Sequence, residues 1–217
     1  MTCVEICAGD GFECNTANLI IMHGWQGLLV DGNEANVKRG VEFYNSNPHT
    51  YIFPPKYVYS WITRDNVNSV IKTNGFEGDI DHLSIDLDGV DYWIWDAINV
   101  IKPRVVVVEY NAILGPDKSL TVPYSDVFNA LEHPKTNGMA NYYGASLTAF
   151  IKLARAKGYR LVGCNRYGYN AFFIRKSLGE KEIPEVSPTD CFGHPRVQWG
   201  IKERFPTVKN LPWVEVQ

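Results

Sequence analysis

The sequence predicts an α/β fold built on a doubly wound, mostly parallel sheet. Short apolar runs alternate with longer amphipathic ones, a glycine turn follows the first apolar run, and Val105–Val108 is unbroken and β-branched. Such an unbroken run is typical of a strand buried on both faces of a parallel sheet. A chain of 217 residues is long enough for one substantial domain, so we expect a single domain over residues 1–217.

The first half of the chain predicts strands and helices in alternation. Strands are expected at Val4–Cys7 and Trp25–Val30. The stretch Tyr51–Tyr59 contains Pro54 and Pro55, so it predicts only an edge strand or an irregular one. The helices expected here are Ala17–His23, Glu34–Asn45 and a stretch ending at Lys72 that Thr63 or Asp65 caps.

The second half continues the same alternation. Strands are expected at His82–Ile85 and Val105–Val108, with an aromatic helix over Tyr92–Ile101 between them. A helix follows at Ser146–Lys157, because Gly158 is a typical helix stop. The last expected elements are a pair of strands, Tyr159–Gly163 and Ala171–Arg175.

Two segments do not fit the alternation. Residues 112–144 are rich in Pro, Asn, Gly and Tyr and are too long for an idle loop, so they predict a functional insertion that lines a ligand cleft. Residues 177–217 contain several prolines and predict an extension packed over the sheet. His133 and His194 fall in these segments and are candidates for touching a ligand, but the five histidines lack a spacing suited to zinc.

Composition counts against several classes of protein. A net charge of −3 shows no excess of basic residues that would bind a phosphate backbone, so we expect no nucleic-acid partner. The apolar runs are far shorter than the roughly 20 residues of a membrane span. Five cysteines are an odd number without a C-x-x-C pair, which predicts free thiols in a reducing compartment and a cytoplasmic protein.

The first turn has features of a nucleotide site. Gly9 and Gly11 follow the first strand and open the first helix, where backbone amides can approach a ligand. Asp31 lies twenty residues beyond Gly11, just past the second strand, where an acid accepts hydrogen bonds from ribose hydroxyls. A plain turn aspartate before Gly32 is the alternative. Cys14 replaces the third glycine of the dinucleotide pattern, which counts against NAD.

A second group of polar residues follows the fourth and fifth strands. Asp86 and Asp88 leave one strand, and Glu109 and Asn111 leave the next, so their oxygens converge at the carboxyl edge. Asp86, Glu109 and Asn111 suit Mg²⁺, Mn²⁺ or Ca²⁺, with Asp88 as the candidate base. Without a metal, neighbouring carboxylates would raise one another's pKa, and one of them could still act as the base. The alternative is that Asp88 and Gly89 form only a turn.

Taken together, six strings resemble one family. They are VEICAGDGFECNTANLI followed by GWQGLLVDGNE, then HLSIDLDGVDYWIWDAI, PRVVVVEYN, YGASLTAFIKLARAKGYRLVGCN and NAFFIRK. The combination resembles the FkbM-type S-adenosylmethionine-dependent methyltransferases over residues 3–176, with 177–217 outside the match. The resemblance implies a Rossmann-like sheet of seven strands with the last one antiparallel. It also implies an O-methyltransferase for sugar hydroxyls in glycan biosynthesis.

The resemblance also implies a set of cofactor residues. Glu5, Ala8, Gly9 and Gly11 would cradle the methionine part of the cofactor, and Asp31 would hold its ribose. The other contacts implied are Asn15, Thr16, Gly32 and Asp86. The family's usual first loop glycine is Cys7 here, which tightens the pocket, and its usual N-terminal helical segment is missing. The chain is therefore expected to be a domain cut from a larger protein or a compact viral form.

Alternatives remain open at this point. The acceptor is a sugar or glycan in the leading hypothesis, and a non-sugar small molecule or a peptide in the second. The third is a non-catalytic or NAD-binding Rossmann-like module. A homodimer and a parent multidomain glycan-assembly protein are both compatible with the sequence.

Overall fold

A computed structural model describes all residues, 1–217, and confirms the predicted fold class. A seven-stranded sheet has the order β3-β2-β1-β4-β5-β10-β9, and its last two strands in sequence run antiparallel to each other. The chain divides into two compact units. We call them the N-terminal unit (Met1–Asp86 with Ala97–Val106) and the C-terminal unit (Leu87–Asp96 with Val107–Gln217). One domain over residues 1–217 stays a prediction.

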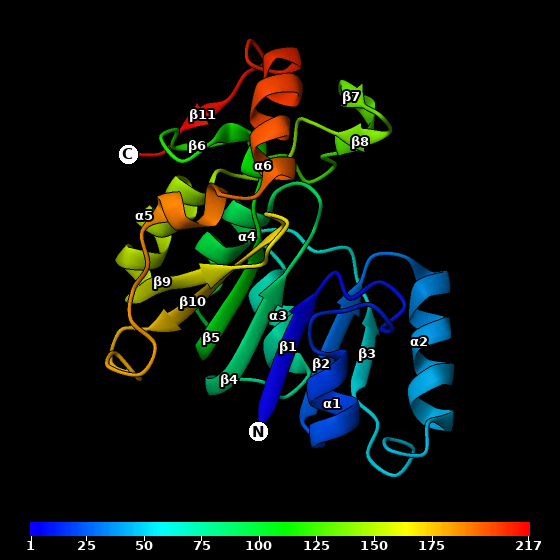
Figure 1. Cartoon of the computed structure of the whole chain (residues 1–217). Helices are drawn as coiled ribbons and strands as arrows, with labels where there is room; N and C mark the ends of the chain where they lie inside the picture. Colours follow the sequence, from blue (N-terminus) through cyan, green and yellow to red (C-terminus); the bar gives the residue numbers. More distant parts are fainter. The chain divides into compact units, whose positions relative to one another are not determined.

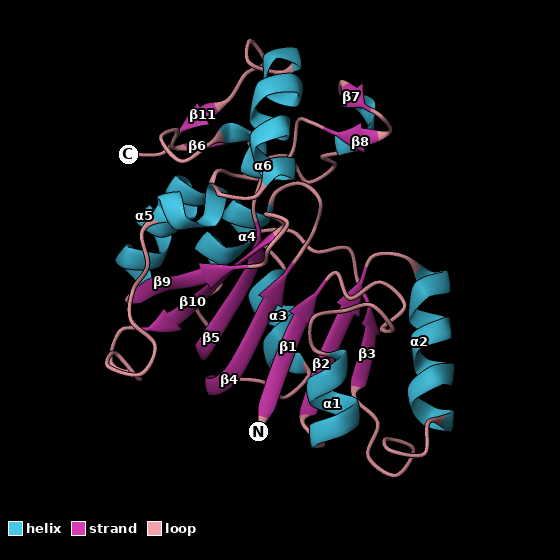
Figure 2. Cartoon of the chain, viewed as in Figure 1, coloured by secondary structure: helices cyan, strands magenta, loops and turns pink.

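In the N-terminal unit, parallel strands alternate with helices (Figures 1 and 2). Ile6 pairs with Val30 on one side and with Ile85 on the other, so three strands end at the same level. A core cluster that includes Ile20 and Leu29 is packed between the sheet and its helices. The elements are β1 (Thr2–Ile6), α1 (Ala17–His23), β2 (Gln26–Asp31), α2 (Glu34–Ser46), β3 (Lys56–Tyr59), α3 (Val67–Thr73) and β4 (Gly78–Ile85).

In the C-terminal unit, the core is aromatic. Trp95 lies 6.1 Å from Phe150 and 5.2 Å from Phe173 between ring centroids. Ser146 caps α5 by accepting a hydrogen bond from Ala149 N, and Gly158 ends it in the left-handed region. The main elements, which begin in the turn after β4, are α4 (Asp91–Ala97), β5 (Ile101–Glu109, shared with the N-terminal unit), α5 (Leu147–Lys157), β9 (Tyr159–Cys164) and β10 (Asn170–Arg175).

The insertion and the tail contain only short elements. Those of the insertion are η1 (Ala112–Leu114), β6 (Leu120–Thr121), η2 (Ala130–Glu132), β7 (Lys135–Thr136) and β8 (Met139–Ala140). Those of the tail are η3 (Pro188–Phe192), α6 (Pro195–Trp199), η4 (Gly200–Arg204), η5 (Phe205–Thr207) and β11 (Val214–Glu215).

Two expectations need correction. The helix expected over Tyr92–Ile101 ends at Ala97, because Asn68 accepts hydrogen bonds from Asn99 N and Val100 N and donates one to the Ala97 carbonyl. The chain then enters β5 at Ile101, four residues before the predicted start.

The tail was expected over the sheet, and its first part does contact β9, where Val186 N donates to the Leu161 carbonyl, but its later part packs against the insertion. Val214 of β11 pairs antiparallel with Thr121 of β6. Tyr142 of the insertion donates a hydrogen bond to the Pro212 carbonyl, and Arg204 donates one to Asn141. The sequence could not show this pairing, because strands of two residues leave no periodic pattern.

Candidate functional site

Glu5 organises the turn between β1 and α1. One carboxylate oxygen accepts a hydrogen bond from Asn15 N, and the other accepts bonds from Thr16 N and Thr16 Oγ1. Glu5 is only 1% exposed, and Thr16 is fully buried. A direct cofactor contact was expected from both residues, but burial gives them a positioning role at the start of α1. Asn15 remains accessible, and its side chain donates to Ser84.

Asp31 holds the glycine turn from the end of β2. Its Oδ2 accepts a 2.8 Å hydrogen bond from Gly9 N, and its Oδ1 accepts bonds from Asn33 N and Asn36 Nδ2. Asp31 is 4% exposed. A carboxylate has about four acceptor positions, so Oδ2 still has room for another donor. The alternative of a plain turn aspartate does not explain the bond to Gly9, which links two strand ends.

Two tyrosines fix the glycine turn from its other side. Tyr57 donates a hydrogen bond to the Gly9 carbonyl at 2.6 Å, and Tyr44 donates one to the Gly11 carbonyl at 2.9 Å. Gly11 has a φ of +81°, and a Cβ there would lie 2.8 Å from the Tyr44 ring. The turn is therefore rigid and requires glycine at this position.

Trp61 is a site residue that the sequence did not reveal. Its indole packs on Gly32, where a Cβ would lie 2.8 Å from Trp61 Cε3, yet the side chain is 58% exposed. Ser60 N donates to the Asp31 carbonyl, which brings the chain after β3 beside the end of β2. No motif marks this aromatic residue, because only the pairing of β2 with β3 places it there.

Asp88 lies in a strained turn that Asp91 holds. The Asp91 carboxylate accepts hydrogen bonds from Leu87 N and Gly89 N. Burial raises the pKa of Asp91 to about 6. Asp88 has a φ of +54°, which is uncommon for a residue with a side chain and often marks functional sites. Its side chain remains exposed, and desolvation raises its pKa.

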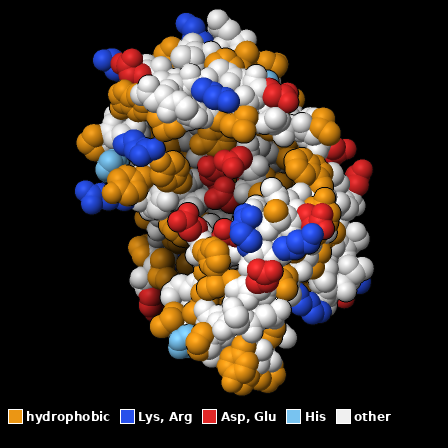
Figure 3. Space-filling model, turned by 90° about the vertical axis from the view of Figure 1, so that its right-hand side faces the viewer, with side chains coloured by type: hydrophobic (Ala, Val, Ile, Leu, Met, Phe, Trp, Pro, Cys, Tyr) orange, Lys and Arg blue, Asp and Glu red, His pale blue; other side chains and the backbone are white.

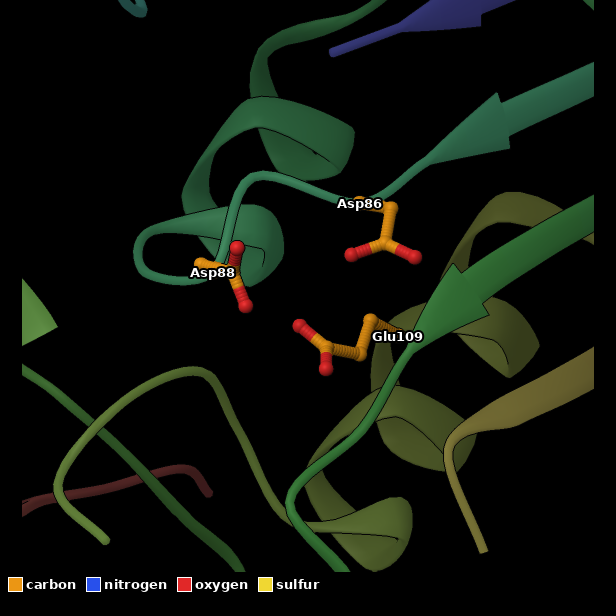
Figure 4. Close-up of side chains that lie close together, drawn as sticks. All are labelled: Asp86, Asp88 and Glu109. Carbon is orange, nitrogen blue, oxygen red and sulfur yellow. The ribbon is translucent and has the colours of Figure 1, made fainter. Parts of the chain in front are cut away.

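The three predicted acids come together. One carboxylate oxygen from each of Asp86, Asp88 and Glu109 lies within 4.8 Å of the others. Figure 4 shows Asp86 and Asp88 on the turn after β4 and Glu109 at the end of β5, with their carboxylates facing one another. Opposite oxygens around a Mg²⁺ ion are about 4.2 Å apart, and around Ca²⁺ somewhat farther. The three carboxylates therefore form an acidic cluster at the ends of β4 and β5.

Asn111 does not join these acids as a ligand. It is almost fully buried, and its side-chain nitrogen donates to the carbonyls of Asn141 and Tyr143. Its side-chain oxygen caps η1 at Ile113 N. The expectation that Asn111 is a metal ligand is therefore corrected: its side chain ties β5 to the end of the insertion.

The insertion reaches the turn that carries Asp88. Gly144 N donates a 2.7 Å hydrogen bond to the Gly89 carbonyl, and a Cβ on Gly89 would lie 2.7 Å from the Phe128 ring. His133 stacks on Phe128 at 5.7 Å between ring centroids and meets Tyr142 edge-on at 4.7 Å. An aromatic group from the insertion thus lies next to the candidate base.

His194 has a structural role in the tail. Its Nδ1 accepts a hydrogen bond from Arg196 N and so caps α6, and its ring contacts Tyr167. These contacts explain the position of the His194 side chain without any contact to a ligand.

Comparison with known proteins supports the fold. No protein-family model matches the sequence, and no curated protein matches it significantly. Among solved structures, an O-methyltransferase family protein from Burkholderia thailandensis has a TM-score of 0.52 at 13% identity, covering 82% of this chain and 52% of that one. The methyltransferase domain of bacterial CtHen1-C has a TM-score of 0.49 at 13% identity, with coverages of 80% and 88%.

A third similar structure is magnesium protoporphyrin IX methyltransferase from Synechocystis PCC 6803 with bound S-adenosylmethionine, with a TM-score of 0.48 at 10% identity and coverages of 81% and 69%. At these identities the likeness concerns the fold alone. The chain shares the Rossmann-like fold of the O-methyltransferase family protein. None of its helices has the length and apolar composition needed to cross a membrane.

Proposed function

We propose that this protein is an S-adenosylmethionine-dependent O-methyltransferase of the FkbM type that acts on a sugar hydroxyl in glycan biosynthesis. The observation that carries the proposal is the bond from Gly9 N to Asp31, which holds a rigid glycine turn beside an acid at the carboxyl edge of the sheet. This arrangement suits a nucleoside whose ribose hydroxyls donate to the acid.

The adenine has a candidate platform in Trp61. Its exposed indole lies on Gly32, one residue beyond Asp31, so a base attached to a ribose at Asp31 would meet the ring face. Aromatic stacking of this kind contributes about 1–3 kcal/mol per base. Trp61 therefore supports a nucleoside cofactor independently of the glycine turn.

The chemistry requires alignment and proton removal. The acceptor oxygen attacks the methyl carbon, the carbon–sulfur bond breaks with its electron pair moving to sulfur, and S-adenosylhomocysteine leaves. Asp88 takes the hydroxyl proton in this proposal, because it is exposed and its raised pKa makes it a better base than an ordinary aspartate. Alignment contributes about 7–11 kcal/mol, and a base accelerates the reaction about 10²–10⁴-fold.

Asp86 and Glu109 would hold a divalent cation such as Mg²⁺, with the carboxylate of Asp88 beside them as the base. When bound, such a cation lowers the pKa of a coordinated hydroxyl. The aromatic side chains of Phe128, Tyr142 and His133 supply ring faces near Asp88 on which the apolar face of a sugar can stack. These two features favour a sugar acceptor over a peptide.

Titration calorimetry of the whole chain tests the cofactor assignment. S-adenosylhomocysteine is expected to bind with micromolar affinity, whereas NAD is expected not to bind, because Cys14 replaces the third glycine of the dinucleotide pattern. Binding of NAD alone, or of neither compound, would contradict the proposal. Methyl transfer from labelled S-adenosylmethionine to a panel of sugars and small phenols then separates the acceptor classes.

A further inference from the structure

An exposed hydrophobic surface lies at the amino ends of β2 and β3 in the N-terminal unit. We call it the apolar face. It is formed by Tyr51, Ile52 and Phe53 of the loop between α2 and β3, all of them exposed. Hydrophobic side chains gather at the lower end of the face shown in Figure 3, where Figure 1 places this loop. Phe53 is 87% exposed, an unusual position for a phenylalanine.

The backbone of this loop is fixed by hydrogen bonds. Thr50 is buried, and its hydroxyl donates to the Tyr44 carbonyl at 2.6 Å. Thr50 N and Tyr51 N both donate to the Asn47 carbonyl, and Phe53 N donates to the Thr50 carbonyl, each at 3.0 Å. The loop therefore presents Phe53 in a defined position, which lowers the entropy that a partner's binding must overcome.

A cavity opens beside Phe53 on the same face. Its volume is about 190 Å³, and its lining includes Ile20 and Trp25 from the α1 side and His49, Tyr51 and Phe53 itself from the loop. A cavity of about 150 Å³ is large enough to hold a benzene ring. The apolar face thus carries both a protruding phenyl ring and a cavity whose volume is sufficient for one.

The two segments that form the face contain no charged side chains. Residues 17–26 and 45–55 contain no Asp, Glu, Lys or Arg. A contact between two identical faces brings like charges together, so a face without charges is suited to self-association. A membrane-binding surface would instead be expected to contain Lys and Arg beside its aromatic residues, and these segments have none.

We propose that the apolar face joins two copies of this chain in a two-fold symmetric dimer, with Phe53 of each copy seated in the cavity of the other. Aromatic side chains and methionine are enriched in the centres of protein interfaces, and charged side chains are depleted there. β2 runs from Gln26 beside this face to Asp31 at the glycine turn, about 17 Å at strand geometry. Dimerisation therefore leaves the carboxyl edge open.

Sedimentation equilibrium of the whole chain tests the dimer. The wild type is expected to dimerise with a dissociation constant in the micromolar range or below. Phe53→Glu changes both halves of the symmetric contact at once, so it is expected to raise that constant at least about 100-fold. Ile183→Glu is the matched control, because it alters an exposed apolar residue of the C-terminal unit, and it should leave the dimer intact.

A second variant tests the seating of the ring. His49→Trp fills the rim of the cavity without changing Phe53, and it is expected to weaken the dimer at least about tenfold. The proposal would be overturned if the wild type stays monomeric at about 100 µM, the upper working concentration. It would also be overturned if either Phe53→Glu or His49→Trp leaves the dimer intact. So would a monomer that binds phosphatidylserine vesicles through Phe53. Circular dichroism and S-adenosylhomocysteine binding serve as fold controls.

Discussion

The amide of Gly9 donates a 2.8 Å hydrogen bond to Oδ2 of Asp31, although the two residues are 22 positions apart in the chain. The bond fixes the glycine turn after β1 against the end of β2. The candidate cofactor site depends on this contact more than on any single motif, because it sets where the turn and the acid lie relative to each other.

Replacing Asp31 is therefore expected to impair cofactor binding. Asp31→Ala removes both the bond to Gly9 and the acceptor for ribose, and a lost charge-assisted contact costs about 1.5–3 kcal/mol. We expect the affinity for S-adenosylhomocysteine to fall about 10–100-fold by calorimetry. Glu34→Ala, an exposed acid at the start of α2, is the control. Unchanged affinity in a folded Asp31→Ala variant would remove Asp31 from the site.

The acidic group after β4 and β5 is expected to control turnover. Asp88→Asn should slow methyl transfer about 10²-fold or more while the affinity for S-adenosylhomocysteine stays the same. The base must be deprotonated to act, and the pKa of Asp88 lies above its ordinary value of 3.8. Activity should therefore fall as the pH drops through this raised pKa.

The role of a cation is tested separately. EDTA should abolish activity and Mg²⁺ should restore it if Glu109 and Asp86 hold a metal, and Glu109→Gln should weaken the Mg²⁺ dependence. Asp117→Asn, an exposed acid of the insertion, serves as the control. Full activity in EDTA and in both acid variants would show that chemistry takes place elsewhere.

The aromatic group of the insertion is expected to bind the acceptor. Phe128→Ala removes the ring that packs on Gly89, so the KM for the acceptor should rise about tenfold while S-adenosylhomocysteine binding is retained. Leu131→Ala, an exposed residue in η2, is the matched control. An acceptor KM that neither substitution changes would argue against the insertion as the acceptor wall.

His82 is expected to make stability depend on pH. It is buried in β4 with Nδ1 lacking a hydrogen-bond partner, and desolvation lowers its pKa from 6.5 to about 4. Below pH 6.5 the unfolded chain binds a proton at His82 that the folded chain does not bind. The free energy of unfolding therefore falls as the pH falls from 6.5 toward 4. Between pH 7 and 4.5 we expect a loss of about 2–3 kcal/mol by urea unfolding. His82→Gln, which cannot become charged, should lose less over the same interval, and an equal loss would contradict this origin.

Cys7 is expected to carry backbone strain. Its φ is +68°, a region that costs a residue with a Cβ about 1–2 kcal/mol and glycine almost nothing. Cys7→Gly should therefore be more stable than Cys7→Ala by about 1 kcal/mol in urea unfolding. Equal stability of the two variants would mean that the turn relaxes without cost.

Much of the candidate site could be predicted from the sequence because it lies where strands end. Asp31, Asp86, Asp88 and Glu109 each follow an apolar run, and parallel strands deliver such residues to one edge. The roles of Glu5 and Asn111 could not be predicted, because a motif gives a residue's position along the chain but not the donors and acceptors that surround its side chain.

The sequence by itself determined the α/β class and the residues at the carboxyl edge, and its resemblance to a family implied seven strands with the last one antiparallel. Hydrophobic period and turn residues are local properties of the chain, so they can be recognised without the fold. Only the tertiary structure decided that Trp61 covers Gly32, that the tail pairs with the insertion, and that Phe53 protrudes beside a cavity. These contacts join segments that are distant in sequence or lack any period, so burial and packing, not local propensity, fix them.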